Sequence, residues 1–237
     1  MPEALDLLEK RRADDPFAFV VTPNVDHIVR LNREEDAGGP LARAYREAWL
    51  CLCDSRVLRR LARHYGVTLT VVPGSDLTAR LLDQIEAGER VTVIGGSSAL
   101  SKALAATYPH IDVRSHVPPM GLATNPAAID ACADFIVTSG SRYTFLAVGS
   151  PQQELVALAT ACRPDAKGTA LCIGASLEFL TGDQVRAPGW MQRAGLEWLH
   201  RLVANPGRMW RRYLIDDPQI FLMARRWAAS RKRSVAP

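Results

Sequence analysis

The sequence of 237 residues lacks the long apolar stretches of membrane-spanning proteins. No uninterrupted apolar run approaches the roughly 20 residues that a transmembrane helix needs. The first residues, MPEALDLLEKRRADD, also lack the charged-then-apolar pattern of a secretory signal. We therefore expect a cytoplasmic protein, and any contact with a membrane is expected to be peripheral.

Cysteine and histidine are few, and neither shows a metal-binding pattern. The five cysteines are an odd number, and none forms a C-x-x-C pair. Cys51 and Cys53 lie two apart in an apolar run, which is typical of small buried side chains on one face of a strand. The five histidines are scattered, without the H-E-x-x-H spacing of a zinc site. These patterns predict a reduced protein without a metal site.

Two common nucleotide-binding fingerprints are absent. The sequence has no G-x-x-x-x-G-K-[ST], which argues against a P-loop NTPase, and no complete G-x-G-x-x-G. What it does have is Gly95-Gly96-Ser97 between a predicted strand and a predicted helix. Backbone N–H groups at such a junction favour a bound phosphate. A tight turn explains the glycine pair equally well, so both interpretations stay open.

Acidic residues are scarce at the C-terminal end. Between Arg186 and Tyr213 there are six arginines, three tryptophans and one acidic residue, Glu197. From Arg186 to the last residue, 11 Lys/Arg oppose 3 Asp/Glu, a net charge of +8, whereas the whole chain carries +4 and its first 185 residues therefore −4. Arginine matches phosphate oxygens, and tryptophan suits a surface that is part apolar and part wet. The asymmetry indicates an anionic partner: a phosphate-bearing substrate, an acidic membrane face or nucleic acid.

Short apolar runs alternate with segments of helical character over most of the chain. They predict strands at 17–24, 49–54, 68–72, 91–95, 111–117, 144–149 and 169–174. Strands separated by helices indicate βαβ units, so we predict an α/β fold: a Rossmann-like, mainly parallel sheet flanked by helices. After about Gly182 the alternation stops, and Asn205-Pro206-Gly207 interrupts any helix. We predict a catalytic domain over 1–182 and a helical Arg/Trp-rich appendage over 183–237.

Ligands of open parallel sheets bind where the strands end, so the residues after each predicted strand are the site candidates. They are Thr22, Asn24, Asp54, Gly95, Gly96, Gly149, Gln153 and Glu154. A carboxylate at the position of Asp54 can act as a general base, or it can cap the following helix. Thr22 and Asn24 either bind ligand or organise the turn at Pro23. Gln153 and Glu154 either bind ligand or form a polar first helical turn.

These strand-end residues and the tail together resemble the WecG/TagA/CpsF family of bacterial glycosyltransferases. The matching pieces follow the family's order over about residues 17–214, and the last of them is the most specific. They are TPN (22–24), an apolar strand ending in Asp54, PGSDL (73–77), VIGG (93–96), VGSPQQE (148–154), IGASLEFLTG (173–182) and RAPGWMQRAGLEWLHRL…NPGRMWRRYL (186–214).

The resemblance implies an inverting, metal-independent glycosyltransferase without a cofactor. It would move a hexose or N-acetylhexosamine from a UDP-sugar to a polyprenyl-diphosphate-linked sugar, for cell-surface polysaccharide or exopolysaccharide. Such enzymes are peripheral on the inner face of the cytoplasmic membrane. The appendage either contacts that membrane or packs as an amphipathic helix on the sheet domain or on a partner subunit. The resemblance makes Asp54 the base, places Thr22 in the same site, and assigns several of the tail arginines to substrate diphosphates. These arginines are Arg201, Arg208, Arg211 and Arg212.

The chain departs from the family pattern at two positions. Ser55 stands where the family usually has glycine after the proposed base, and Gln152 stands where it usually has lysine. The missing cation near the donor favours a neutral hexose or N-acetylhexosamine over a uronate. A homo-oligomer is left open.

Two other classes compete with this interpretation. One is a nucleotide-cofactor-binding oxidoreductase or methyltransferase on the same scaffold, which the poor glycine fingerprint disfavours. The other is a nucleic-acid-binding protein that uses the basic tail. The tail arginines alternate with Trp, Leu and Met, and no nucleic-acid-binding motif is present, so we expect no nucleic-acid partner.

Overall fold

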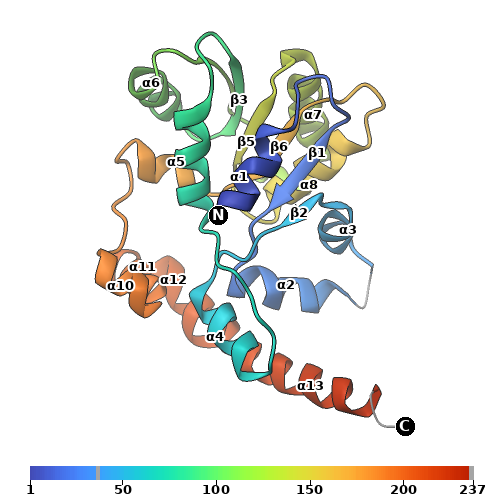
Figure 1. Cartoon of the computed structure of the whole chain (residues 1–237), viewed down its shortest axis with the longest axis vertical. Coiled ribbons are helices and arrows are strands. Elements are labelled where there is room, and N and C mark those ends of the chain that lie inside the picture. The colour runs from blue at the N-terminus through green and yellow to red at the C-terminus, as the bar shows by residue number, and fades with distance from the viewer. Residues whose placement is uncertain (36–37, 235–237) are drawn as a thin grey trace. The chain divides into compact units, whose positions relative to one another are not determined.

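The computed structural model describes residues 1–35 and 38–234 (Figure 1). By their contacts the residues form two compact units. The first unit comprises Met1–Thr22, Ala37–Leu52 and Val72–Val185. The second comprises Pro23–Asp36, Cys53–Val71 and Arg186–Pro237. The chain therefore passes between the units several times, and it does so just after β1 and just after β2.

The first unit is built on one sheet of six parallel strands. In chain order they are β1 (Ala18–Val21), β2 (Leu50–Cys51), β3 (Arg90–Gly95), β4 (Asp112–His116), β5 (Tyr143–Ala147) and β6 (Thr169–Cys172). Their order across the sheet is β2-β1-β6-β5-β3-β4, and every pairing is parallel. The predicted α/β class with a parallel sheet is thus confirmed.

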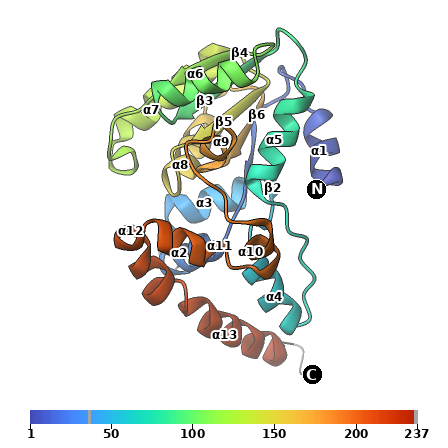
Figure 2. The same ribbon diagram turned by 90° about the vertical axis from the view of Figure 1, so that its left-hand side faces the viewer.

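Helices cover both faces of this sheet. Val93, Phe145 and Leu171 pack on one face with α1 (Pro2–Glu9), α5 (Gly74–Gln84), α6 (Ser98–Thr107) and α9 (Ser176–Leu180). Ile94, Leu146 and Cys172 pack on the other with α3 (Pro40–Glu47), η1 (Leu122–Thr124), α7 (Pro126–Ser139) and α8 (Gln152–Ala161). Figure 2 shows α1 and α5 on one side of the sheet and α7 and α8 on the other. Successive strand residues face opposite sides, so strands buried on both faces read as continuous apolar runs.

The connections of the sheet diverge at β3 and β5. From β3 the chain runs through α6 to β4, at one edge of the sheet. From β5 it runs through α8 to β6, which lies in the opposite direction across the sheet. Because β3 and β5 are neighbours, with Gly95 beside Ala147, the carboxyl ends of these two strands form a topological switch point. Open α/β sheets bind ligands at such points.

The second unit is helical. It contains α2 (Val25–Glu35), α4 (Arg56–His64), α10 (Gly189–Ala194), α11 (Glu197–Ala204), α12 (Pro206–Arg211), the π-helical turn η2 (Arg212–Asp216) and α13 (Gln219–Ser234). The expected break at Asn205-Pro206-Gly207 is confirmed, since α11 ends at Ala204 and α12 begins at Pro206. Within this unit α13 contacts α2 and α4, and η2 contacts α2. The tail helices therefore pack with two helices from the first quarter of the chain.

One strand prediction is wrong, and another is confirmed only in part. Residues 68–72 form no strand, and Val71 makes only an isolated parallel bridge with Cys53. The β-branched residues there favour an extended chain, but no neighbouring strand supplies a ladder of hydrogen bonds. The apolar run 49–54 forms a strand of only two residues at the edge of the sheet, where Cys51 is exposed. The expectation of buried cysteines holds for Cys132 and Cys172 and fails for Cys51 and Cys162.

Candidate functional site

Thr22 is the last residue of the first segment of the first unit and follows β1 directly. It is buried, and its Oγ1 donates to the carbonyl oxygen of Cys172 on the neighbouring strand β6 at 2.8 Å. This bond fixes the side chain at the carboxyl edge of the sheet. Because a hydroxyl has two acceptor lone pairs besides its one donor, Thr22 can still accept a hydrogen bond from a ligand.

The Gly95-Gly96 turn is tightly packed. Gly95 has a φ of +98°, and an added Cβ would lie 2.6 Å from Cγ1 of Val148 and 2.8 Å from the carbonyl oxygen of Ala147. Ser97 caps α6, because its Oγ accepts from the N–H of Leu100 at 3.1 Å. The close packing explains why glycine is needed in this turn, as the turn interpretation expects. Contact of these glycines with a phosphate stays a prediction.

Gly149 differs from this pair. It also has a positive φ, +73°, but an added Cβ would meet nothing within 4 Å. Glycine is therefore required there by the backbone conformation alone, and there is open space beside it at the end of β5.

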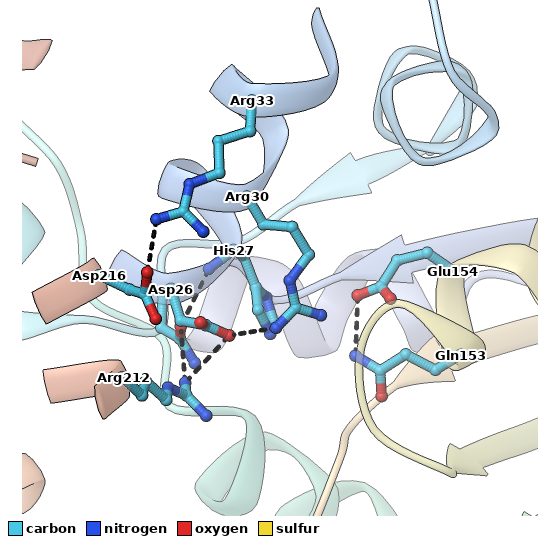
Figure 3. Close-up of polar contacts among 9 residues, drawn as sticks. Asp26, His27, Arg30, Arg33, Gln153, Glu154, Arg212 and Asp216 are labelled. Atoms are coloured by element: carbon cyan, nitrogen blue, oxygen red, sulfur yellow. Dashed lines mark hydrogen bonds and ion pairs between the residues drawn. The ribbon is translucent and has the colours of Figure 1, made fainter. Parts of the chain in front are cut away.

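Gln153 links two loops at the carboxyl edge of the sheet. Its Oε1 accepts from the N–H of Gly174, after β6, at 2.9 Å. Figure 3 shows its second contact, in which Nε2 donates to Oε1 of Glu154 at 2.9 Å. Gln153 and Glu154 are almost fully buried, with exposed fractions of 2% and 0%. Both ends of the Gln153 amide are thus engaged within the protein, so its direct role is to position the loops after β5 and β6. Sugar binding by this pair stays a prediction.

A cavity of about 460 Å³ lies within the second unit. Four of the predicted site residues line it: Asn24, Asp54, Arg201 and Arg212. They come from all three segments of the unit, far apart in the sequence. Polar and apolar side chains that the sequence analysis did not single out complete the wall. They include Arg56, Arg60, Glu197, Trp198, Tyr213, Asp217, Ile220 and Phe221.

Asp54 lines this cavity and does not cap α4. The N-cap is Ser55, whose Oγ accepts from the N–H of Leu58 at 3.2 Å. The backbone N–H of Asp54 donates to the carbonyl oxygen of Pro23 at 2.9 Å, which holds this residue beside the segment that follows β1. The capping interpretation of Asp54 is therefore wrong. Ser55, which replaces the family's glycine, performs the capping.

The arginines of the cavity wall also tie its segments together. Arg56 pairs with Glu197 at 3.0 Å, and Nη1 of Arg60 donates to the carbonyl oxygen of Ala194 at 2.7 Å. Both contacts join α4 to the tail. The guanidinium groups thus have a structural function as well as a positive charge.

Arg212 joins η2 to the start of α2. Its Nη2 lies 3.4 Å from Oδ2 of Asp26 (Figure 3). The same Nη2 lies 3.5 Å from Oδ1 of Asn24. Asp26 also pairs with Arg30 at 2.9 Å, and Oδ1 of Asn24 accepts weakly from the N–H of His27 at 3.4 Å. The predicted ligand-binding atoms of Asn24 and Arg212 are therefore partly engaged in shaping the second unit.

The four tail arginines of the family motif do not all meet in this cavity. Arg208 and Arg211 lie on α12. Arg211 is exposed and does not line the cavity as far as the structure describes its wall, whereas the side chain of Arg208 lies outside the described part. Arg201 and Arg212 are the two predicted arginines that line it.

Asp217 is a buried carboxyl group in the cavity wall. Burial raises the pKa of its carboxyl to about 6; the nearby Arg212 opposes this shift, and Asp26 and Asp216 reinforce it. Sequence reasoning missed Asp217, although the pair Asp216-Asp217 stands out in a basic tail. His27 in the same unit shows the opposite case, because burial lowers the pKa of its imidazole to about 4 and keeps it neutral.

In residues 1–35 and 38–234, no group of three or more His, Cys, Asp or Glu is arranged to hold a metal ion. Within the same ranges, no helix is both long enough and apolar enough to cross a membrane.

The sheet order, the two covered faces and the glycine turns at the switch point define a doubly wound, Rossmann-like α/β protein. A second, helical unit adds a cavity lined by carboxylates and arginines. The chain belongs to the glycosyl transferase WecG/TagA/CpsF family, whose model matches residues 1–234. The protein is thus a glycosyltransferase of cell-surface polysaccharide biosynthesis, as the motifs and the tail indicated. A match over nearly the whole chain favours this class over the oxidoreductase, methyltransferase and nucleic-acid-binding alternatives.

Proposed function

We propose that this protein is an inverting, metal-independent glycosyltransferase. It transfers a hexose or N-acetylhexosamine from a UDP-sugar to a polyprenyl-diphosphate-linked sugar. The observation that carries the proposal is the cavity of the second unit, where Asp54, arginines and an apolar wall occur together. A lipid-linked acceptor presents hydroxyl groups, a diphosphate and a hydrocarbon chain, and each finds a chemical counterpart in that wall.

Asp54 is the proposed general base. As the acceptor oxygen bonds to the anomeric carbon of the donor sugar, the bond from that carbon to the UDP oxygen breaks, and UDP leaves with the electron pair. The proton of the acceptor hydroxyl passes to the Asp54 carboxylate. Attack opposite the leaving group inverts the anomeric centre. Thr22 lies two residues before Asn24, and its side chain is held by a hydrogen bond to the carbonyl oxygen of Cys172. We propose that Thr22 acts in the same reaction.

The diphosphate charges are proposed to be met by arginines and backbone donors. Guanidinium groups bind phosphate oxygens with matched pairs of N–H groups, and fixed positive charge stabilises a departing diphosphate. Arg201 and Arg212 line the cavity, and Arg208 and Arg211 on α12 are proposed to serve the same chemistry. Gly95, Gly96 and Gly149 at the switch point are proposed to contact the donor, with Gln153 and Glu154 near its sugar or ribose.

The donor is proposed to be a neutral sugar. Gln152, the first residue of α8, stands where the family usually has a lysine, so a cation that would attract a uronate is missing there. A panel of UDP-sugars tests this proposal, and it fails if a UDP-uronic acid proves to be the best donor.

The second unit is proposed to face the inner surface of the cytoplasmic membrane. It carries 17 Lys/Arg and 8 Asp/Glu, a net charge of +9, whereas the first unit carries 12 and 17, a net charge of −5. It also exposes large apolar side chains, with exposed fractions of 60% for Trp190, 50% for Trp210 and 57% for Phe221. Basic and aromatic side chains together suit the headgroup region of an anionic membrane. In this proposal the appendage predicted over 183–237 acts with α2 and α4.

The proposal is tested by UDP release from the purified protein in the presence of EDTA. The substrates are a panel of UDP-sugars and short-chain polyprenyl-diphosphate sugars. We expect release that depends on the acceptor, and a loss of about 100-fold or more in kcat for Asp54→Asn, because a positioned base contributes about that much. The exposed Asp165→Asn, a matched change in the first unit, should keep the wild-type rate. Release that needs no acceptor, or an unimpaired Asp54→Asn, contradicts the proposal.

A further inference from the structure

We propose that Asp217 recognises a hydroxyl group of the acceptor sugar in the cavity of the second unit. Asp217 would thus be a specificity-determining residue. The inference rests on the proposed function, because it assigns the acceptor to this cavity.

The first observation is that the cavity wall holds polar atoms without partners. Asp217 is only 9% exposed, and its Oδ1 is buried and has no hydrogen-bond partner among the described residues. Nε of Arg212, another residue of the wall, is in the same state within the described part of the chain. Burying a polar or charged group without a hydrogen bond is unfavourable, so such groups in native proteins call for an explanation.

The second observation concerns the hydrogen-bonding chemistry of the two atoms, Oδ1 of Asp217 and Nε of Arg212. The Asp217 oxygen needs a donor, and the Arg212 N–H needs an acceptor. A hydroxyl group can donate and can accept, and a sugar presents several hydroxyl groups. A phosphate at neutral pH only accepts, and its charge is repelled by Asp217, whereas an ammonium only donates. A sugar hydroxyl therefore fits this part of the wall better than the diphosphate does, and water is its simplest competitor.

The third observation is the backbone that presents Asp217. The N–H of Asp217 donates to the carbonyl oxygen of Arg212 at 2.8 Å, closing the π-helical turn η2. Single π-helical turns occur frequently at functional sites. Nη2 of Arg212 is directed to Asp26 and Asn24, while the charge of Arg212 still favours the ionised carboxyl of Asp217. The terminal torsion of an aspartate is soft, so either carboxylate oxygen can turn toward the cavity.

The charges around Asp217 predict how its recognition depends on pH. Arg212 and Arg30 favour the ionised carboxyl, while Asp26, Asp216 and above all burial disfavour it, which places its pKa at about 6. An ionised carboxylate binds a hydroxyl more strongly than the protonated acid does. Recognition of the sugar should therefore be full near pH 8 and weaker near pH 5.

The experiment separates the sugar from the diphosphate by using two kinds of probe. Affinities of the full-length protein are measured for farnesyl diphosphate and for a panel of farnesyl-diphosphoryl hexoses. We expect wild type near pH 8 to bind its best hexose probe roughly 10 to 100 times more tightly than farnesyl diphosphate, as expected for a hydrogen bond to a charged group. Asp217→Asn should bind the hexose probe more weakly than wild type does and should bind farnesyl diphosphate at least as tightly, so most of this ratio should be lost. Near pH 5 the wild-type ratio should fall toward that of the variant.

The neighbouring Asp216→Asn is the matched control. It removes the same charge one position away, but Asp216 pairs with Arg33 outside the cavity wall, so the ratio should be kept. Circular dichroism of each variant verifies folding. An unchanged ratio in Asp217→Asn overturns the inference alone, since water would then be the partner of Asp217. Failure of wild type to bind any probe overturns the proposed function and the inference with it.

Discussion

A buried carboxyl group such as Asp217 affects stability in a way that depends on pH. Its pKa is about 6 in the folded protein against an ordinary value of 3.8, because burial disfavours the charged form. Above pH 6 both folded and unfolded states are ionised, and the folded state bears the full cost of the buried charge. As pH falls through 6 the folded state takes up the proton first, so this cost disappears toward pH 4.

Asp217→Asn should therefore stabilise the folded protein, by an amount that depends on pH. Near pH 8 the neutral amide should raise the free energy of unfolding by about 1–3 kcal/mol, since each unit of pKa shift corresponds to about 1.4 kcal/mol. Near pH 4 the variant and wild type should unfold alike. Thermal unfolding at the two pH values measures the difference, and a variant less stable than wild type near pH 8 contradicts the prediction. If Asp217→Asn gains stability but loses sugar recognition, the carboxylate of Asp217 lowers the stability of the fold and serves binding.

The second residue-scale prediction compares two glycines of the first unit. Gly95→Ala should cost about 2–4 kcal/mol of folding free energy, because its Cβ would collide with Val148 and the backbone of Ala147 in addition to the strained φ. Gly149→Ala should cost only about 1 kcal/mol, from the positive φ alone. Urea unfolding measures both values. If Gly149 contacts the donor as proposed, its variant should also raise the KM for the UDP-sugar.

At the scale of an element, η2 shows how one turn can separate two adjacent arginines. Arg212 points to Asp26 and Asn24 and so holds η2 on α2. Arg211, the last residue of α12, is exposed. The two side chains have the same chemistry but different partners.

The prediction for these arginines is a split between stability and binding. Arg212→Ala should lower the free energy of unfolding by about 1–3 kcal/mol, because it removes the contacts with Asp26 and Asn24 that hold η2 on α2. Arg211→Ala should change stability by less than about 0.5 kcal/mol, as exposed substitutions usually do, and should instead raise the KM for the lipid-linked acceptor. Thermal unfolding and steady-state kinetics on the same preparations check both. Equal losses of stability in the two variants would refute the distinction.

At the scale of the whole molecule, the charge is divided between the two units. The second unit carries +9 and the first −5. Helix α4 contributes to the positive charge of the second unit with Arg56, Arg59, Arg60 and Arg63, although it lies far from the tail in the sequence. Each basic residue near an anionic membrane contributes about 1 kcal/mol of attraction at most, which salt weakens.

The whole-molecule prediction is that the protein co-sediments with phosphatidylglycerol vesicles at low salt and is released at high salt. Phosphatidylcholine vesicles should bind it weakly. The pair Arg59→Glu and Arg63→Glu on exposed positions of α4 should abolish most of the binding. The pair Arg80→Glu and Lys102→Glu makes the same charge change on exposed positions of the first unit and should not. Equal loss in both double variants would contradict a role specific to the second unit.

The site could be predicted only in part from the sequence. The alternation of apolar runs and helices predicted the parallel sheet, and the motifs placed Asn24, Asp54, Arg201 and Arg212 among the site candidates. The extended segment 68–72 was predicted as a strand because β-branched residues favour one, but a strand also needs a partner, which tertiary structure supplies or withholds. Gln153 was expected to meet a ligand, yet its amide is engaged by Gly174 and Glu154.

The α/β class, the family and the concentration of positive charge near the C-terminal end follow from the sequence, because they depend on local patterns and on composition. Folding is needed to bring α2 and α4 into one unit with the tail and to bury Asp217 in a cavity wall near Arg212. Arg212 and Asn24 meet although they are 188 positions apart in the chain. Burial, pKa and unsatisfied hydrogen bonds are set by such distant neighbours, so no local pattern contains them.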